Sequence, residues 1–343
     1  MGQKLIQTIK QLYDKASSAV LFQDRIGEWF HTSVGVRQGC LLSPTLFNIF
    51  LEQIMTEALE EHNGTITIGG RIITNLRFAD DIDGLAGNEG ELANLVNHLD
   101  ETSTRYGMEI SAEKTKLMTN REEPVRTKIT VNGQELETVK KFKYLGAIIS
   151  QEGSKPEVLA RIALTSAALA KLKPIWRDKN IALASKTRLL HALVTSIFLY
   201  ACETWTLTAE LQRKIQAVEM RCFRRLLGIS YTDHITNNEV KRRIRQHLGH
   251  YEDLLTLVKK KKLRFYGHTV RSNGMSKTIL QGTVPGKRRR GRQKKKWLDN
   301  IMEWTGRTFA ETQTLARNRD RWRKLMHSSS VQRPYDPGGL RDS

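Results

Sequence analysis

Hydrophobic positions in the first hundred residues recur mostly at helical spacing. Apolar residues three and four apart predict an amphipathic helix over 3–20. A second helix is predicted from Pro44 to about Glu60, because proline is favoured in a first turn and Ser43 can act as the N-cap. A third, over 91–106, is predicted to end at Gly107, since glycine readily takes the left-handed conformation that follows a helix.

Short alternating segments between these helices predict strands and hairpins. Strands over 20–22 and 29–34 are expected around a turn at Arg25–Gly27, and we expect this ribbon and residues 65–86 to form one antiparallel sheet. Asn132-Gly133 lies between two alternating segments and is the strongest hairpin signal, since this pair accepts positive φ at both positions.

The pattern changes beyond Gly153, where Ala, Leu, Lys and Arg predominate and alternation is lost. Helices are predicted over about 156–174, 181–201, 208–227 and 236–246. The sequence therefore predicts an α+β part followed by an all-helical part, with a boundary near residue 150.

Charge divides the chain at the same place. Residues 1–150 carry 16 Lys and Arg against 20 Asp and Glu, a net charge of −4, whereas the remaining residues carry 40 against 16, a net of +24. Together they give the formal charge of +20 for the 343 residues. This asymmetry predicts a polyanion-binding second half, with nucleic acid as the polyanion, and a solvated basic surface is the alternative.

Other features of the composition exclude several protein classes. No apolar run approaches the roughly 18 residues of a membrane span, and the N-terminus lacks the apolar core of a secretory signal. Three scattered cysteines, Cys40, Cys202 and Cys222, argue against a disulfide framework and fit a reducing compartment. We therefore expect an intracellular protein, nuclear or cytoplasmic, without a membrane partner.

Two adjacent acidic residues give the first chemical signal. Asp80 and Asp81 lie between two apolar strand segments, at the expected tip of a hairpin. A divalent cation such as Mg²⁺ relieves the repulsion between neighbouring carboxylates and prefers their oxygen atoms. An ordinary Asp-Asp turn is the alternative reading of this pair alone.

A second signal lies about 40 residues earlier, in the segment GVRQGCLLSPTLFN over 35–48. Gly39 permits close approach of the backbone, Gln38 can bond a base or sugar edge, and Arg37 can contact a phosphate. A simple loop leading into a helix explains the same residues equally well.

Four segments together resemble successive motifs of reverse transcriptases, in particular those of non-LTR, LINE-type retrotransposons. They are GVRQGCLLSP from residue 35, FADD at 78–81, EKTKLM at 113–118 and FKYLGAIIS at 142–150, in the family's order and approximate spacing. The resemblance covers residues 1–150. Later segments such as LRFYGHTVR are similar to the C-terminal region of LINE reading frames and extend it to about residue 305.

This resemblance implies a fold and an activity. The fold would be α+β: a partial polymerase palm, with an antiparallel sheet backed by helices, then a helical thumb and a basic helical C-terminal region. The implied boundaries are 1–150 for the palm, 151–230 for the thumb, 231–327 for the basic region and 328–343 for a disordered tail. The implied reaction is RNA-directed DNA polymerisation with two Mg²⁺ or Mn²⁺ ions, an RNA template, a DNA primer or target, and deoxynucleoside triphosphates.

Site residues follow from the resemblance position by position. Asp80 and Asp81 would be the metal-binding catalytic aspartates, and Lys114 a proton donor to the leaving pyrophosphate. The template and nucleotide would contact five residues, which are Arg37, Gln38, Gly39, Phe78 and Ala79. The primer terminus would be gripped by a hairpin that carries Phe142, Tyr144, Leu145 and Gly146.

One departure from the family pattern is expected to reduce activity. The family's first catalytic aspartate lies on a strand ahead of the first helix here, and neither Asp14 nor Asp24 has the sequence context of that motif. The fingers region is not matched either. We therefore expect an N-terminally truncated reverse transcriptase that is inactive or very weak by itself. The alternatives are a non-catalytic nucleic-acid-binding remnant and a basic helical DNA-binding protein in which FADD is accidental.

Two basic clusters are candidates for nucleic-acid contact. Eight cationic residues occur within 287–296, namely Lys287, Arg288, Arg289, Arg290, Arg292, Lys294, Lys295 and Lys296. Such a run predicts salt-dependent phosphate binding or a nuclear localisation signal. The second cluster, Lys259–Lys262, is followed by Phe265 and Tyr266, which could stack on bases or pack inside a helix bundle.

Overall fold

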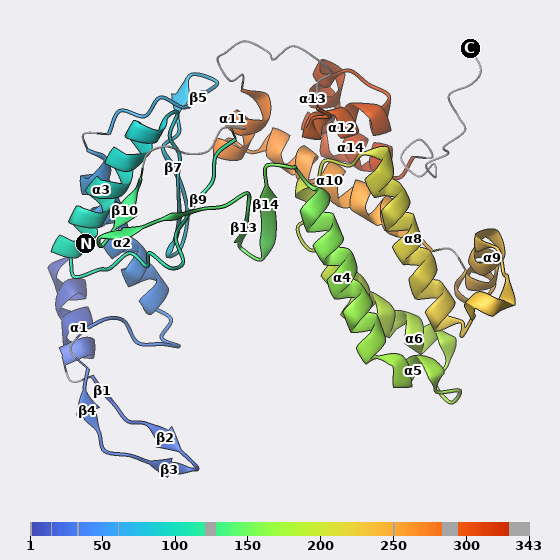
Figure 1. Ribbon diagram of the computed structural model, residues 1–343, viewed down its shortest axis with the longest axis horizontal. Coiled ribbons are helices and arrows are strands. Elements are labelled where there is room, and N and C mark those ends of the chain that lie inside the picture. Colours follow the sequence, from blue (N-terminus) through green and yellow to red (C-terminus); the bar gives the residue numbers. More distant parts are fainter. Residues whose placement is uncertain are drawn as a thin grey trace. The chain divides into compact units, whose positions relative to one another are not determined.

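The computed structural model describes residues 2–14, 16–32, 34–60, 62–120, 128–249, 251–282 and 294–328. The protein has an α+β fold (Figure 1). Its contacts divide it into two compact units. The first comprises Met1–Ile66, Ile73–Ala112 and Thr127–Glu135, and the second Thr67–Ile72, Glu113–Arg126 and Leu136–Ser343. Among the described residues, no helix is both long enough and apolar enough to cross a bilayer.

The helices of the first unit are α1 (Gln3–Asp14), α2 (Ser43–Leu59) and α3 (Glu89–Arg105). Of these, α2 and α3 contribute buried side chains to the core of the unit. The buried apolar side chains of α2 lie three or four positions apart and so share one face, which carries Leu51, Ile54, Met55 and Ala58. Helix α3 buries Leu95 and ends before Gly107, whose φ of +69° confirms the predicted helix end.

The strands of the first unit are short antiparallel pairs. These are β1 (Ser17–Ser18) with β4 (Phe30–His31), β2 (Leu21–Phe22) with β3 (Arg25–Ile26), β7 (Asn75–Phe78) with β8 (Asp81–Gly84), and β10 (Thr130–Val131) with β11 (Gln134–Glu135). Within the described ranges, residues 17–31 pair only with one another, so the expected single sheet with residues 65–86 is wrong. The strands β2 and β3 have no buried residue to anchor them on a neighbouring strand.

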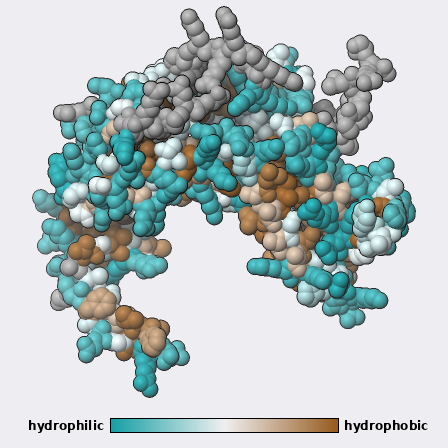
Figure 2. Space-filling model, viewed as in Figure 1, coloured by the Kyte–Doolittle hydropathy of each residue, from teal (hydrophilic) through white to brown (hydrophobic). Residues whose placement is uncertain are grey.

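Two turn predictions had different outcomes. Asn132-Gly133 forms the predicted two-residue hairpin turn, with φ of +50° and +73°. The β2–β3 turn was predicted at Arg25–Gly27 but lies at Gln23–Asp24, with φ of +47° and +60°, and the prediction was wrong because it required glycine for positive φ. Figure 2 shows brown, apolar side chains exposed on this hairpin. Its Phe22 is 70% exposed.

Three strand pairs belong to the second unit. These are the antiparallel pairs β5 (Thr67–Ile68) with β6 (Arg71–Ile72) and β13 (Lys141–Tyr144) with β14 (Ala147–Ser150), and the parallel pair β9 (Lys116–Leu117) with β12 (Glu137–Thr138). All four residues of β13 pair with those of β14, from Lys141 with Ser150 to Tyr144 with Ala147.

Helices make up the rest of the second unit. They are α4 (Lys155–Lys171), α5 (Lys173–Arg177), α6 (Leu183–Leu189), a π-helical segment (Leu190–Thr195), α7 (Ser196–Phe198), α8 (Ala209–Leu226), α9 (Asn237–Leu248), α10 (Leu254–Arg271), α11 (Met275–Gln281), α12 (Trp297–Thr305), α13 (Phe309–Arg317) and α14 (Arg319–Met326). Short 3₁₀ turns occur at Cys202–Thr204 and Tyr231–Asp233. The four helical segments predicted between 156 and 246 are confirmed within a few residues.

Aromatic side chains fill the centre of the helical core. Phe198, Trp205, Tyr266 and Trp322 are each at most 1% exposed. The indole of Trp322 donates a hydrogen bond to the Leu263 carbonyl at 2.9 Å, which ties α14 to α10. Tyr266 therefore packs in the core and does not present its ring for base stacking.

Candidate active site

The FADD segment forms the tip of the β7–β8 hairpin. Phe78 pairs with Asp81, so Ala79 and Asp80 make a two-residue turn. Ala79 adopts φ of +53°, an uncommon conformation for a residue with a side chain. All four residues are exposed, and Phe78 is 63% exposed. The structure thus confirms that two adjacent carboxylates project from a hairpin tip into solvent.

Contacts with α2 and α3 hold this hairpin. Arg77 on β7 forms an ion pair with Glu52 on α2 at 2.8 Å. Gly84 on β8 lies against α3, where an added Cβ would meet the Leu95 side chain at 3.2 Å. The helix from Pro44 therefore contacts the hairpin that carries the aspartates through one ion pair, whereas the predicted packing behind a larger sheet is not formed among the described residues.

Glu91 fixes the loop that follows the hairpin. Its carboxylate accepts hydrogen bonds from the backbone amides of Thr65 at 2.8 Å and Gly87 at 3.1 Å. Partial burial alone would raise the pKa of Glu91, but the bonds from Thr65 and Gly87 outweigh burial and lower it. The Glu91 carboxylate therefore ties three segments of the first unit together. The sequence pattern had predicted it only as part of a helix.

Arg37 is held by the first helix. Its guanidinium donates a hydrogen bond to the Leu12 carbonyl at 2.9 Å and lies 5.5 Å from the centre of the Tyr13 ring. The side chain is exposed, so N–H groups that do not contact Leu12 face solvent. This arrangement orients the Arg37 guanidinium, and it is compatible with the predicted phosphate contact.

Ser43 does not cap α2 as predicted. The residue lies inside the helix, and its hydroxyl donates to the Arg37 carbonyl at 2.6 Å. That bond closes the loop carrying Gln38 and Gly39, both exposed, and Gly39 adopts φ of +83°. The cap prediction failed because the helix begins one residue earlier than expected, with Leu42 at the N-cap and Ser43 in the first turn. The backbone amide of Leu42 also lowers the pKa of the neighbouring Cys40 thiol.

The expected metal ligands are oxygen atoms at an exposed tip. Asp80 and Asp81 offer four carboxylate oxygens, which suits a hard cation such as Mg²⁺. Within the part of the chain that the structure describes, no group of three His, Cys, Asp or Glu side chains is arranged to hold a metal ion. Asp80 and Asp81 therefore suit a divalent cation chemically, but they supply only part of its ligand set.

The FKYLG hairpin lies in the second unit. Tyr144 pairs with Ala147, so Leu145 and Gly146 form the turn, with φ of +46° and +79°. Phe142 lies on β13 and pairs with Ile149. The structure brings these predicted primer-grip residues together on one two-stranded hairpin, and their contact with a primer stays a prediction.

Residues that the sequence analysis did not select clamp this turn. Arg161 on α4 donates to the Gly146 carbonyl, and the Tyr200 hydroxyl donates to the Leu145 carbonyl at 2.5 Å. The Arg161 guanidinium also lies 4.5 Å from the centre of the Tyr200 ring. Both carbonyls of the turn are therefore bonded to side chains of the helical part.

A buried ion pair fixes the clamp. Glu157 and Arg161 side chains are 4% and 9% exposed, and their Oε1 and Nε atoms lie 2.6 Å apart. The second carboxylate oxygen of Glu157 accepts the Ile148 amide at 2.7 Å. The i,i+4 spacing of this pair was visible in the sequence, but it is equally typical of an exposed helix face.

The remaining predicted residues lie elsewhere in the second unit or outside the description. Lys114 is exposed in a turn between α3 and β9. Lys294 and Lys296 are exposed at the start of α12, whereas Lys295 forms an ion pair with Glu303. The other five cationic residues of the run, Lys287, Arg288, Arg289, Arg290 and Arg292, lie outside the described residues.

The second basic cluster is partly internal. Lys259, Lys260 and Lys262 are 5%, 7% and 0% exposed, so only Lys261 of this group is exposed to solvent. A fully exposed nucleic-acid-binding run at 259–262 is therefore wrong. These lysines fall on the core-facing turns of α10, where their aliphatic stems pack among apolar side chains.

Comparison with known proteins assigns the first part of the chain. Residues 2–149 match the family described as reverse transcriptase (RNA-dependent DNA polymerase), and this range contains the FADD hairpin and the GVRQG loop. This match covers less than half of the chain, and it shows similarity to a reverse transcriptase domain over residues 2–149. The FKYLG hairpin up to Ile149 belongs to the same match.

Three relatives show where similar chains occur. An uncharacterised transposon-derived protein of Caenorhabditis elegans is 28% identical over 280 residues, which is 77% of this chain and 99% of the relative. Retrovirus-related Pol polyproteins from the type-1 retrotransposable element R2 of Nasonia vitripennis and Popillia japonica are 29% and 30% identical, each over 49% of this chain. The alignments span 17% and 30% of those two polyproteins.

Proposed function

We propose that this chain takes part in RNA-directed DNA synthesis by a non-LTR retrotransposon, with Asp80 and Asp81 as ligands of the catalytic ions. The observation that carries the proposal is the exposed pair of adjacent carboxylates at the β7–β8 tip, inside the range that is similar to a reverse transcriptase domain. The substrates would be an RNA template, a DNA primer and deoxynucleoside triphosphates.

Mg²⁺ or Mn²⁺ would be held by the oxygen atoms of Asp80 and Asp81. When bound, such ions activate the primer 3′-hydroxyl and stabilise the leaving pyrophosphate. The protein's part is to fix the carboxylates, and it does so through the Arg77–Glu52 ion pair and the packing of Gly84 against Leu95. Lys114, which is exposed, would be the proton donor to the leaving pyrophosphate, as the family resemblance implies.

We further propose that this chain alone extends a primer slowly. Two-metal catalysis needs carboxylates on both sides of the two metal ions. The described residues bring no third metal-binding side chain to Asp80 and Asp81. Loss of ~4 kcal/mol of transition-state stabilisation lowers a rate about a thousandfold. Nucleic-acid binding would be retained, since the positive charge lies after residue 150.

Metal binding and primer extension test these statements separately. In the full chain, Mn²⁺ binding followed by electron paramagnetic resonance should weaken at least about tenfold in Asp80→Asn, because the ion loses a charged ligand. Extension of a DNA primer on an RNA template should be slow in the parent chain, and undetectable in Asp80→Asn.

Asp24→Asn is the matched control, because Asp24 also lies at an exposed hairpin tip and asparagine tolerates its φ of +60°. This variant should bind Mn²⁺ and extend the primer like the parent. Equal losses in Asp24→Asn and Asp80→Asn would refute the assignment. Template–primer binding without Mn²⁺ binding would favour the second candidate, a non-catalytic nucleic-acid-binding remnant.

A further inference from the structure

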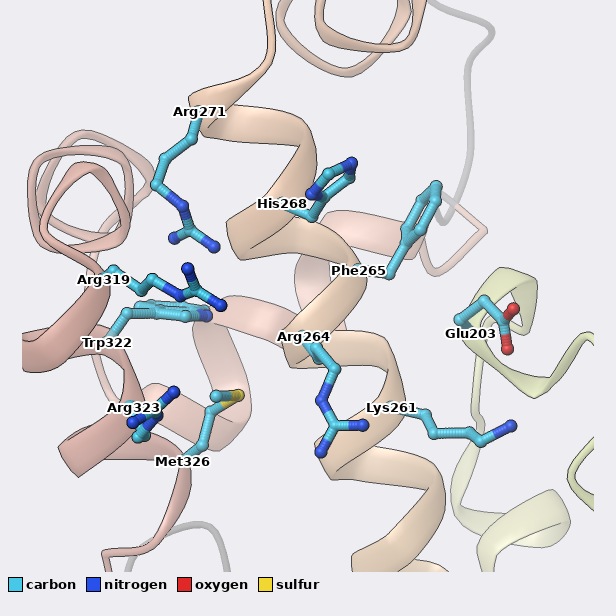
Figure 3. Close-up of a pocket in the computed structure, with 10 residues that line it drawn as sticks. All are labelled: Glu203, Lys261, Arg264, Phe265, His268, Arg271, Arg319, Trp322, Arg323 and Met326. Carbon is cyan, nitrogen blue, oxygen red and sulfur yellow. The ribbon is translucent and has the colours of Figure 1, made fainter.

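A basic cavity of about 700 Å³ lies in the second unit, and part of its lining comes from the segment LRFYGHTVR. Its walls come from α10, α14 and the 3₁₀ turn at Cys202–Thr204 (Figure 3). The lining side chains are Glu203, Lys261, Arg264, Phe265, His268, Arg271, Arg319, Trp322, Arg323 and Met326. None of them is part of the reverse transcriptase match over residues 2–149.

One wall is the exposed face of α10. Lys261, Arg264, Phe265, His268 and Arg271 are all exposed, and their spacing of three and four places them on one side of the helix. This face alternates cations with an aromatic ring and an imidazole. At a rise of about 1.5 Å per residue, the ten steps from Lys261 to Arg271 extend over about 15 Å.

The opposite wall is one face of α14. Arg319, Trp322, Arg323 and Met326 repeat the same spacing, and Figure 3 shows the Arg319 and Arg323 side chains beside the Trp322 ring. Gly267 on α10 lets this wall come close, because an added Cβ would lie 2.4 Å from the Trp322 Nε1 atom. The close packing at Gly267 fixes the distance between the two basic faces.

Charge in the cavity is not compensated. Five cationic side chains face one carboxylate, Glu203, which leaves a net of +4 with His268 neutral. Within the described stretches, Arg264, Arg319 and Arg323 form no ion pair and no side-chain hydrogen bond. Cations without partners on two facing helices repel one another, and a bound anion would remove that repulsion.

Two further contacts indicate that the walls are fixed before a ligand arrives. The Arg271 guanidinium donates to the Ala316 carbonyl at 2.6 Å and so closes the end of α13. Partial burial and the nearby Arg319 charge both lower the pKa of Arg271. The Lys261 ammonium donates to the Leu199 carbonyl at 3.2 Å, which fixes the other end of the α10 face.

We propose that this cavity binds a single-stranded nucleic acid, with consecutive phosphates on Arg264, Arg319 and Arg323 and a base stacked on Phe265. A polynucleotide fits better than a single phosphate because the cations extend along about 15 Å of helix. A single strand fits better than a duplex because the Phe265 ring needs an unstacked base. Phe265 is 41% exposed, so its ring is accessible.

The site extends the proposed function without depending on it, since no catalytic aspartate lines it. It also explains the segment LRFYGHTVR at 263–271. Leu263, Tyr266 and Gly267 face the core and α14, whereas Arg264, Phe265, His268 and Arg271 face the cavity. The segment is therefore a helix whose two sides serve packing and binding.

Binding of the full chain to fluorescent single-stranded oligonucleotides tests the proposal, with DNA and RNA of one sequence as separate arms. Arg264→Gln/Arg323→Gln should weaken binding by about tenfold or more at 0.1 M salt in at least one arm, and flatten the slope of log K against log salt by about 1.4, since each lost contact removes about 0.7. Phe265→Ala should weaken binding about tenfold with an unchanged slope, because stacking releases no counterions.

Matched controls carry the same chemical changes outside the cavity. Arg213→Gln/Arg321→Gln removes two exposed arginines, one from α8 and one from α14, and Tyr231→Ala removes an aromatic ring that is 92% exposed. Each should change affinity less than about threefold, as expected of screened surface charges. Equal losses in the control and cavity variants would overturn the proposal, as would full competition by inorganic triphosphate, which would indicate a site for small anions.

Discussion

The buried Lys262 offers the sharpest test of the helical core. Its side chain is fully buried, and its ammonium nitrogen donates to the Trp205 carbonyl at 2.6 Å and to Asn300 Oδ1 at 3.0 Å. The ring centres of Trp297 and Trp304 lie 4.5 and 5.5 Å from the same nitrogen. The perturbation is Lys262→Met, which keeps the length of the side chain and removes the amine.

The magnitude follows from the protonation equilibrium. Burial, and then the nearby Lys295 charge, lower the pKa of Lys262 from 10.5 to about 6. The indole faces stabilise an ammonium by about 0.5–2 kcal/mol, which is less than the several kcal/mol that its desolvation costs. At pH 7.5 the Lys262 amine is protonated in the unfolded chain and neutral in the folded chain. Removing its proton about three pH units below the ordinary pKa costs the folded state ~4 kcal/mol.

Replacement by methionine removes this cost but also removes two hydrogen bonds. Each is worth about 1 kcal/mol, and the Trp205 carbonyl loses its donor. Asn300 Oδ1 keeps the bond from the Leu207 amide at 2.7 Å. We therefore expect Lys262→Met to raise the free energy of unfolding by about 1–2 kcal/mol at pH 7.5.

The pH dependence has a defined sign. Below pH 6 Lys262 is charged in both states and the full penalty applies, and above pH 10.5 it is neutral in both and none applies. Between these values the unfolded chain binds the extra proton, so the stability of the parent rises with pH by about 1.4 kcal/mol per unit. From pH 7.0 to 8.5 the advantage of Lys262→Met should therefore shrink by ~2 kcal/mol.

Urea unfolding of the full chain, followed by tryptophan fluorescence, measures this change. Five of the six tryptophans lie in the second unit, so the signal reports on its core. Glu219, whose pKa burial raises to about 7, titrates at the lower edge of this pH window. It is present in both proteins, so the difference between Lys262→Met and the parent isolates the titration of Lys262. The exposed Lys261→Met is the control. A pH-independent difference between Lys262→Met and the parent would refute the reasoning.

Two further substitutions test packing. Arg161→Met leaves the Glu157 carboxylate buried without its partner, and should lower the free energy of unfolding by about 3–5 kcal/mol and speed amide hydrogen exchange in β13 and β14. Gly267→Ala places a Cβ 2.4 Å from the Trp322 Nε1 atom, and should cost about 1–3 kcal/mol in urea unfolding, whereas Gly274→Ala, which has open space, should cost less than about 0.5.

Hairpins were predictable where the turn residues themselves specify the backbone. Asn132-Gly133 has one dominant conformation between alternating segments, and the structure adopts it. The aspartate pair was placed at a hairpin tip on different grounds, because it lies between two apolar strand segments. Gln23–Asp24 was missed because no glycine marks it, although aspartate tolerates positive φ.

Lysine burial was not predictable from spacing alone. The run Lys259–Lys262 contains a lysine at every helical angle, so its charge gives no amphipathic signal. The flanking apolar residues decide the orientation: Val258, Leu263 and Tyr266 are buried, and Lys262 lies between them on the same side of α10. A charge is expected on the surface unless a partner exists, and the partners here are Trp205 and Asn300, which are distant in sequence.

The composition and hydrophobic pattern change near residue 150, where strands give way to helices. Hydrogen bonds across this position show that the strands before it and the helices after it are not structurally independent. The two carbonyls of the FKYLG turn are bonded by Arg161 and Tyr200, and the Ile148 amide is bonded by Glu157. These side chains come from the helices that follow the motif. The conformation of the hairpin therefore depends on residues 9 to 55 positions later in the chain, and a fragment ending at residue 150 would lack these three side chains.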